Sequence, residues 1–95
     1  MLSLLVKMTK VFITSKYDGE SLLYTATECG PVWVNAEHIL QLEPFGVVYD
    51  ERTGTATGEF THTRISLGDE AYAYVKEDPE TILVLIDGER ARMAS

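Results

Sequence analysis

Cysteine is almost absent from this chain. Cys29 is the only one among 95 residues, so no internal disulfide can form. Chains without disulfides are typical of reducing compartments. A nucleophilic cysteine needs an activating partner such as histidine, and no histidine is adjacent to Cys29 in the sequence. We therefore expect a passive thiol and a chain that folds in a cytoplasm.

Basic residues are also scarce. The chain has 8 lysines and arginines against 15 aspartates and glutamates, which gives a formal net charge of -7. Proteins that bind nucleic acid neutralise phosphates with clustered basic side chains. The basic residues here are few and scattered, so direct nucleic-acid binding is not expected. The excess of acid most simply serves solubility; the alternative is a surface complementary to a basic partner, including mimicry of nucleic acid.

Long apolar runs are missing as well. The first seven residues, MLSLLVK, are far too few to span a bilayer, and they lack the basic start and the cleavage site of a signal peptide. Met8 offers a second start to the reading frame, which makes residues 1–8 either a leader extension or a loose or strand-like N-terminus. We expect no membrane partner and a cytoplasmic location, in a bacterium or in a host cell if a phage encodes the protein.

A reaction centre is not recognisable in the sequence. His38, His62 and Cys29 lack the spacing of metal ligands, and no Gly-x-Ser-x-Gly elbow is present. The segment 54–58 has two glycines but lacks the lysine and the strand-to-helix context of a phosphate-binding loop. We predict no catalytic residue, no metal and no cofactor, and hence a protein that is not an enzyme. A deep pocket holding a histidine beside Cys29 would reopen that question.

What the chain does contain is a series of short β-branched and aromatic runs separated by turn residues. The length predicts one domain of residues 1–95. The expected strands cover residues 11–14, 21–27, 32–34, 39–44, 45–49, 60–67 and 71–75. Asp18-Gly19 and Gly68-Asp69 predict hairpin turns. Residues 28–31 predict a strand break, and the polar segment 50–58 predicts an exposed, mobile loop.

The C-terminal part predicts a helix. Asp78 can cap it, Pro79 suits its first turn and Gly88 suits its end. Residues 81–86 are apolar all round and fit a buried strand equally well, and the caps favour the helix. Residues 89–95 predict a flexible polar tail. The expected fold is α+β and mostly β, a small antiparallel sheet curled into a barrel or half-barrel with one C-terminal helix.

Aromatic side chains offer the best prospect of a binding surface. Trp33 is the only tryptophan. It suits half-buried core packing, with an interface anchor as the alternative. Alternation along the strand at 71–75 places Tyr72 and Tyr74 opposite the small residues, on the outer face. Arg64 on the neighbouring strand can lie against them. Trp33, Arg64, Tyr72 and Tyr74 are therefore the predicted partner-binding residues.

Three elements of the sequence together resemble a known family. The first, Val-x-Val-Asn-x-x-x-Ile, is matched by Val32, Val34, Asn35 and Ile39. The second, Thr-x-Ile-x-Leu, is matched by Thr63, Ile65 and Leu67, and the third, Val-x-Glu-x-Pro-Glu-Glu-Ile, is matched at Val75, Glu77, Pro79, Glu80 and Ile82. These elements are similar to those of the small flagellar and swarming-motility proteins of bacteria, over residues 32–87. The resemblance implies a short single-domain fold whose third element leads into a helix, and a role in motility.

These features together favour a small non-enzymatic regulatory or adaptor module that acts through protein–protein contacts. Asn35 and Asp78 are expected to serve only as structural caps. Formation of a homo-oligomer is a second use of the exposed sheet face, since a chain this short buries only a modest core. The alternative is an inhibitor, encoded by a phage or a mobile element, that covers a basic host protein with an acidic surface. Binding that weakens steeply with salt would indicate this alternative.

Overall fold

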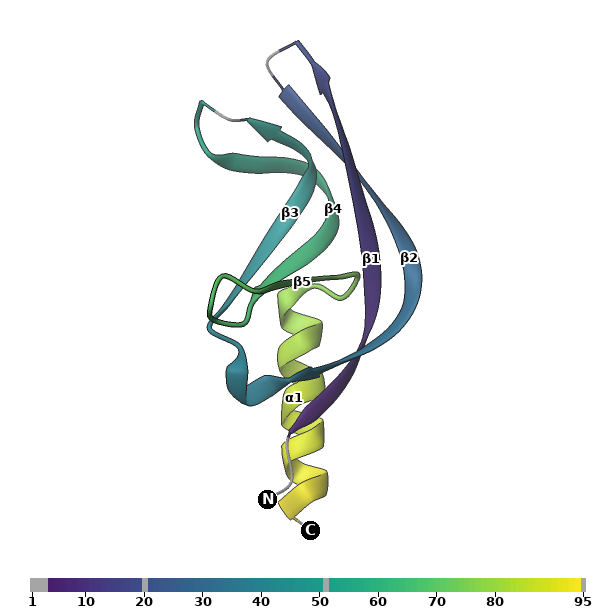
Figure 1. Ribbon diagram of the computed structural model, residues 1–95, viewed down its shortest axis with the longest axis vertical. Coiled ribbons are helices and arrows are strands. Elements are labelled where there is room, and N and C mark those ends of the chain that lie inside the picture. Colours follow the sequence, from purple (N-terminus) through teal and green to yellow (C-terminus); the bar gives the residue numbers. More distant parts are fainter. Residues whose placement is uncertain (1–3, 20, 51, 95) are drawn as a thin grey trace.

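The structure is a computed structural model that describes residues 4–19, 21–50 and 52–94. In this part of the chain, antiparallel strands close into a small barrel and one α-helix follows them, as the sequence predicts (Figure 1). The elements are β1 (Leu5–Asp18), β2 (Ser21–Asn35), the 3₁₀ turn η1 (Ala36–His38), β3 (Gln41–Asp50), β4 (Thr55–Ser66), β5 (Tyr72–Val75) and α1 (Pro79–Ala94). The chain is therefore α+β and mostly β.

A long hairpin of β1 and β2 forms one side of the barrel. The two strands pair from Leu5 with Asn35 to Asp18 with Ser21, so the break expected at residues 28–31 and the separate strand after it are wrong. The register shifts once there, and Cys29 is the residue that the pairing skips. Gly30 takes a positive φ of 123° at this bulge, which bends the strand without ending it.

A second hairpin, of β3 and β4, forms the opposite side. Pairing runs out to Asp50 with Thr55, so the loop expected at residues 50–58 is wrong and only its tip is a turn. The exposed side chains at 57–60 explain the error, because a hairpin end with both faces in water lacks the apolar alternation of a packed strand. The expected boundary at Pro44 is wrong as well, since β3 passes through it without interruption.

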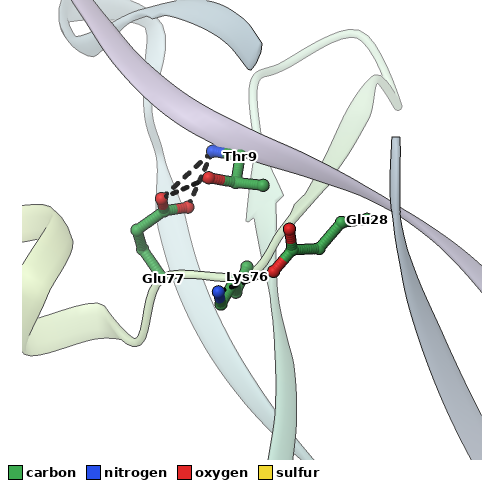
Figure 2. A network of polar contacts seen from close by, with 4 residues as sticks. All are labelled: Thr9, Glu28, Lys76 and Glu77. Atoms are coloured by element: carbon green, nitrogen blue, oxygen red, sulfur yellow. Dashed lines mark hydrogen bonds and ion pairs between the residues drawn. The ribbon is translucent and has the colours of Figure 1, made fainter. Parts of the chain in front are cut away.

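The barrel closes where β5 meets β1. Within the described residues their backbone pairing consists of Lys10 with Val75, extended by a bond of 2.9 Å from the Lys76 N–H to the Thr9 carbonyl. The carboxylate of Glu77 continues this seam (Figure 2). It accepts from the Thr9 N–H at 2.9 and 3.1 Å and from the Thr9 hydroxyl at 2.9 Å. The Glu77 carboxylate thus accepts the hydrogen bond that a backbone carbonyl would accept if β5 were longer.

The helix α1 begins as expected. The Asp78 carboxylate accepts from the Thr81 N–H at 2.8 Å, which is an N-cap, and residues 81–86 are helical and not a strand. The helix does not end at Gly88, whose φ is not among the positive values that a glycine C-cap requires. It continues to Ala94, so the tail expected from residue 89 is wrong over residues 89–94. No helix of the described residues is long and apolar enough to cross a membrane.

The hydrophobic core lies at the helix end of the barrel. It is aliphatic and consists of Leu4, Val6, Met8, Val34, Ala36, Ile65, Val75, Ile82 and Ile86. The residues contributed by β1 belong to the segment that the sequence presents as either a leader or a strand-like N-terminus. The strand-like interpretation is confirmed for residues 5–8, which belong to β1, and Val6 and Met8 are among the most completely buried side chains in the described chain.

Candidate functional site

The other half of the barrel holds a cleft of about 610 Å³. It is lined by Lys10, Val11, Phe12, Ile13, Tyr24, Glu43, Pro44, Phe45, Gly54, His62, Arg64 and Tyr74. These residues come from all of the barrel strands β1 to β5, so the cleft exists only when the barrel is closed. Its walls are mainly aromatic and polar, whereas the core at the helix end is aliphatic.

An aromatic cluster forms the floor of the cleft. The rings of Phe45 and His62, on paired strands, are stacked with centroids 5.0 Å apart and 3° between their planes. Tyr24 meets both of them edge-on, at 5.8 and 5.7 Å. Tyr74 approaches His62 from β5 at 5.8 Å. Such stacked and edge-to-face arrangements are the favourable ones for aromatic pairs, so these rings hold one another in fixed positions.

Arg64 lies on the same face of β4 as His62, two residues further along. Its guanidinium carbon is 5.3 Å from the centre of the Phe45 ring and 4.9 Å from that of Tyr72. The Nη2 group donates to both carboxylate oxygens of Glu43, at 3.0 and 2.9 Å. Burial alone would lower the pKa of Arg64, but the hydrogen bonds and charge of Glu43 outweigh burial and raise that pKa. The Arg64 guanidinium is thus held in place, and the Glu43 carboxylate compensates its positive charge.

The hydrogen bonds of His62 fix the position of its proton. The Thr61 hydroxyl is 3.1 Å from the Phe45 carbonyl and 2.9 Å from His62 Nδ1. A hydroxyl has one hydrogen, and the carbonyl can only accept it. Both contacts are satisfied at once when the hydroxyl donates to the carbonyl and Nδ1 donates to the Thr61 oxygen, and in this tautomer Nε2 of the neutral ring is an acceptor. Burial, with a further effect of the Arg64 charge, lowers the pKa of His62 from its ordinary 6.5, so the ring is neutral at pH 7.

The Nε2 lone pair borders the cleft on a side chain that is only 1% exposed. The described residues contain one side-chain nitrogen or oxygen that is fully buried without a hydrogen-bond partner, and that atom is Arg64 Nε. Arg64 Nε lies in the guanidinium that faces the Phe45 and Tyr72 rings. His62 lines the cleft and has no described partner at Nε2, so this nitrogen retains contact with the cleft space.

The structure brings together three of the four predicted site residues. Arg64 packs on Tyr72, and both are next to Tyr74 on the paired strands β4 and β5. Trp33 stands apart on β2, where its side chain is 57% exposed and Lys7 Nζ lies 5.9 Å from the centre of its ring. The expected half-buried core packing of Trp33 is therefore wrong.

Several cleft residues were not predicted. Tyr24 and Phe45 meet because β2 pairs with β3 next to them, and no local pattern signals the pairing of these two strands. His62 could have been found, because alternation along β4 places it on the face of Arg64. Cys29 and His38 are exposed and do not line the cleft. The described residues contain no group of three or more His, Cys, Asp or Glu side chains that could hold a metal ion.

Comparison with known proteins gives no relative for this chain. No family model, no curated protein and no solved structure matches it. The resemblance to motility proteins stays a prediction. The structure does show what two of the matching positions do here. Asn35 accepts from the Glu37 N–H at 3.0 Å and caps η1, and Pro79 is the first residue of α1.

Proposed function

We propose that this chain is a small non-enzymatic regulatory or adaptor module that binds a protein partner through the Arg–Tyr patch, defined as Arg64, Tyr72 and Tyr74. The observation that supports this proposal is the geometry of Arg64, which contacts Glu43 on one side and the Tyr72 ring on the other. Tyrosine and arginine are the residues in which interface binding energy concentrates. Tyr72 and Tyr74 are 49% and 37% exposed, so their rings are accessible to a partner.

Pre-organisation of the patch supports this proposal. A flexible arginine or tyrosine loses side-chain freedom when a partner binds, and this loss weakens the complex. Here Arg64 is already ordered by an ion pair in which Nη2 donates to both Glu43 oxygens, and by two rings. The patch therefore offers apolar area and hydrogen-bonding groups at a small further entropic cost. Trp33, exposed on the β1–β2 hairpin, is a second contact in the same proposal.

The same geometry predicts a weak dependence on salt. The charge of Arg64 is matched by Glu43 at 2.9 Å, so binding at the patch draws on ring contacts more than on net charge. An inhibitor that covers a basic host protein with its acidic surface would lose affinity steeply as salt screens the charges. A cytoplasmic location, bacterial or in a phage-infected host, fits the exposed free thiol of Cys29.

The test is a pull-down with immobilised protein at low and high salt, followed by affinity measurement with the partner it identifies. We expect one partner retained at both salt concentrations. The double substitution Tyr72→Thr and Tyr74→Thr should weaken its binding by about 30-fold or more, as loss of a hot spot does. Leu40→Ser, at a side chain that is 73% exposed outside the patch, is the matched control.

Two outcomes would count against the proposal. A partner that binds the tyrosine double variant as tightly as the unchanged protein would show that the patch is not the interface. A partner released at high salt would instead favour the acidic inhibitor, because its binding would rest on the net charge of -7. The Leu40→Ser control separates either result from a general loss of surface apolarity.

A further inference from the structure

We propose that the cleft between the two hairpins binds a planar aromatic group that carries one hydrogen-bond donor, with the donor bonded to His62 Nε2. An indole or a phenol has this chemistry. The site is separate from the outward-facing ring of Tyr72, which does not line the cleft. Arg64 and Tyr74 belong both to the Arg–Tyr patch and to the cleft lining, so the two surfaces adjoin, and His62 belongs to the cleft alone.

The dimensions and walls of the cleft fit such a group. Small-molecule sites commonly have volumes of roughly 300–1,000 Å³, and this cleft has about 610 Å³. Tyr24 and Phe45 contribute ring edges and faces, and Phe12 and Ile13 contribute apolar surface from β1. A flat ring in this space would meet aromatic neighbours in the stacked or edge-on contacts that such rings prefer.

The polar groups of the cleft select a hydrogen-bond donor. Arg64 Nη2 already donates to both oxygens of Glu43, so the charge of the guanidinium is compensated within the cleft. Neutral His62 presents a lone pair at Nε2, fixed there by the Thr61 hydroxyl. A lone pair attracts an N–H or O–H group and repels an anion. The ligand group at Nε2 is therefore a hydrogen-bond donor, while Lys10 and Arg64 are the cations of the cleft lining.

Two sources could supply this group, a free aromatic compound or the tryptophan or tyrosine side chain of a protein. In the second case the inference rests on the proposed function, because the side chain would belong to the partner. The recognition chemistry at His62 is the same for both. Two probes, free indole and N-acetyltryptophanamide, distinguish the sources because the second has an amide group on each side of the Cα atom that carries its indole side chain, as a tryptophan in a protein does.

The test is an NMR titration of the full ¹⁵N-labelled chain with indole and with 1-methylindole, which has the same rings but no N–H. We expect indole to shift the signals of cleft residues such as Tyr24 and Phe45 and to bind about five-fold more tightly than 1-methylindole, the effect of one net hydrogen bond. The ¹⁵N signal of His62 Nε2 should move with indole and stay in place with 1-methylindole.

The variant His62→Phe keeps a ring beside Phe45 and removes the acceptor, so it should bind both compounds equally. If this variant does not fold, the Nε2 signal of the unchanged protein still decides. Equal binding of the two compounds to the unchanged protein, or shifts confined to residues outside the cleft, would overturn the proposal. Tighter binding of N-acetyltryptophanamide than of indole would support it with a protein as the source, and the reverse order would support it with a free compound.

Failure of this titration would leave the proposed function standing. The tyrosine double variant removes the Tyr74 ring, which lies 5.8 Å from the His62 ring, so the indole titration uses only the unchanged protein and His62→Phe, in which the patch is intact. A chain that binds its partner through the patch and ignores indole would refute the inference alone. A chain that binds indole through His62 but keeps its partner despite the tyrosine substitutions would refute the function alone.

Discussion

His62 and Arg64 are basic side chains in one cleft, and the cleft avoids an uncompensated positive charge at each of them in a different way. Arg64 is charged at any ordinary pH, and Glu43 compensates that charge at 2.9 Å. His62 has no carboxylate among its described partners, and burial makes its charged form unfavourable. The result is one fixed ion pair and one neutral ring two residues apart. Protonation of His62 would place a second positive charge beside Arg64 in a partly desolvated site.

This arrangement predicts that stability depends on the charge of His62. Because its pKa is lowered in the folded state, the unfolded chain takes up a proton first as the pH falls. The stability that neutral His62 contributes is fully present above the ordinary pKa of 6.5. It is lost as the pH falls through the lower pKa of His62 in the folded state. We expect the urea midpoint of unfolding to decrease over this range, and the midpoint of His62→Phe to decrease less.

Asp78 provides the internal check on that experiment. Hydrogen bonding to Thr81 lowers the pKa of its carboxyl, so the stability that it contributes is lost only at more acidic pH than that of His62. The loss due to His62 therefore begins near its ordinary pKa of 6.5, and the loss due to Asp78 begins only near its ordinary pKa of 3.8. If the unchanged protein and His62→Phe lose stability in parallel below pH 6.5, the histidine is not the group responsible.

At the scale of single residues, prediction from the sequence works where alternation alone decides. The strand period places Arg64 against Tyr72, and the structure confirms this contact at 4.9 Å. The strand period does not predict the exposure of Trp33. Alternation indicates which face of the strand a side chain occupies, but not whether other residues cover that face. The β1–β2 hairpin leaves Trp33 exposed because no described aliphatic core residue packs outside it.

At the scale of elements, glycine and proline do not end the strands where the local sequence predicts. Residues 28–31 form a bulge within β2, and β3 passes through Pro44. Both prolines lie in parts of their strands with one paired neighbour, since β2 and β3 pair only from Ser21 to Leu23 in the described chain. An edge position tolerates the missing N–H of proline. Edge status depends on tertiary structure, which local sequence does not reveal.

Gly88 gives the clearest test of an element boundary. It lies inside α1 with helical φ, and a Cβ at this position would meet no atom within 4 Å. Gly88→Ala should therefore stabilise the protein by about 0.5–1 kcal/mol, because alanine has less backbone freedom to lose on folding and a higher helix propensity. The free energy of unfolding from urea titration measures this change.

Gly19→Ala is the matched control for Gly88→Ala. Its Cβ would also meet no atom within 4 Å, but its φ is +65°. The same chemical change should therefore destabilise the protein at Gly19, because alanine is strained in the left-handed region. If Gly88→Ala also destabilises, then the helix ends at Gly88, as its sequence context first indicated, and residues 89–94 lie outside the helix.

At the scale of the whole molecule, the fold divides into two chemically different halves. Aliphatic side chains from β1, β4, β5 and α1 fill the helix end, and rings with polar partners surround the cleft at the other. The sequence predicts the class, an antiparallel curled sheet with one helix, because periodicity and caps are local. It does not predict where the barrel closes, since that depends on the Glu77 carboxylate meeting Thr9, 68 positions away.

The helix-end core implies that the first residues of the chain are needed for stability. A chain that starts at Met8 lacks Leu4 and Val6, whose side chains are 4% and 1% exposed, and it lacks the Leu4 carbonyl that accepts from the Ala36 N–H at 2.8 Å. Burial of two such side chains contributes about 3–6 kcal/mol. This is a large part of the total stability of a small domain, about 5–15 kcal/mol.

We therefore expect the chain that starts at Met8 to lose its cooperative thermal unfolding transition, or to unfold at a much lower temperature than the full chain. Leu5→Ser in the full chain is the control, because Leu5 lies on the same strand but is 49% exposed and should change the transition little. Circular dichroism during heating measures both. A shortened chain that melts at the temperature of the full one would show that β1 before Met8 adds no net stability. In that case the pairing of Met8 with Val32 and the strand beyond it would hold the barrel closed without the residues that precede Met8.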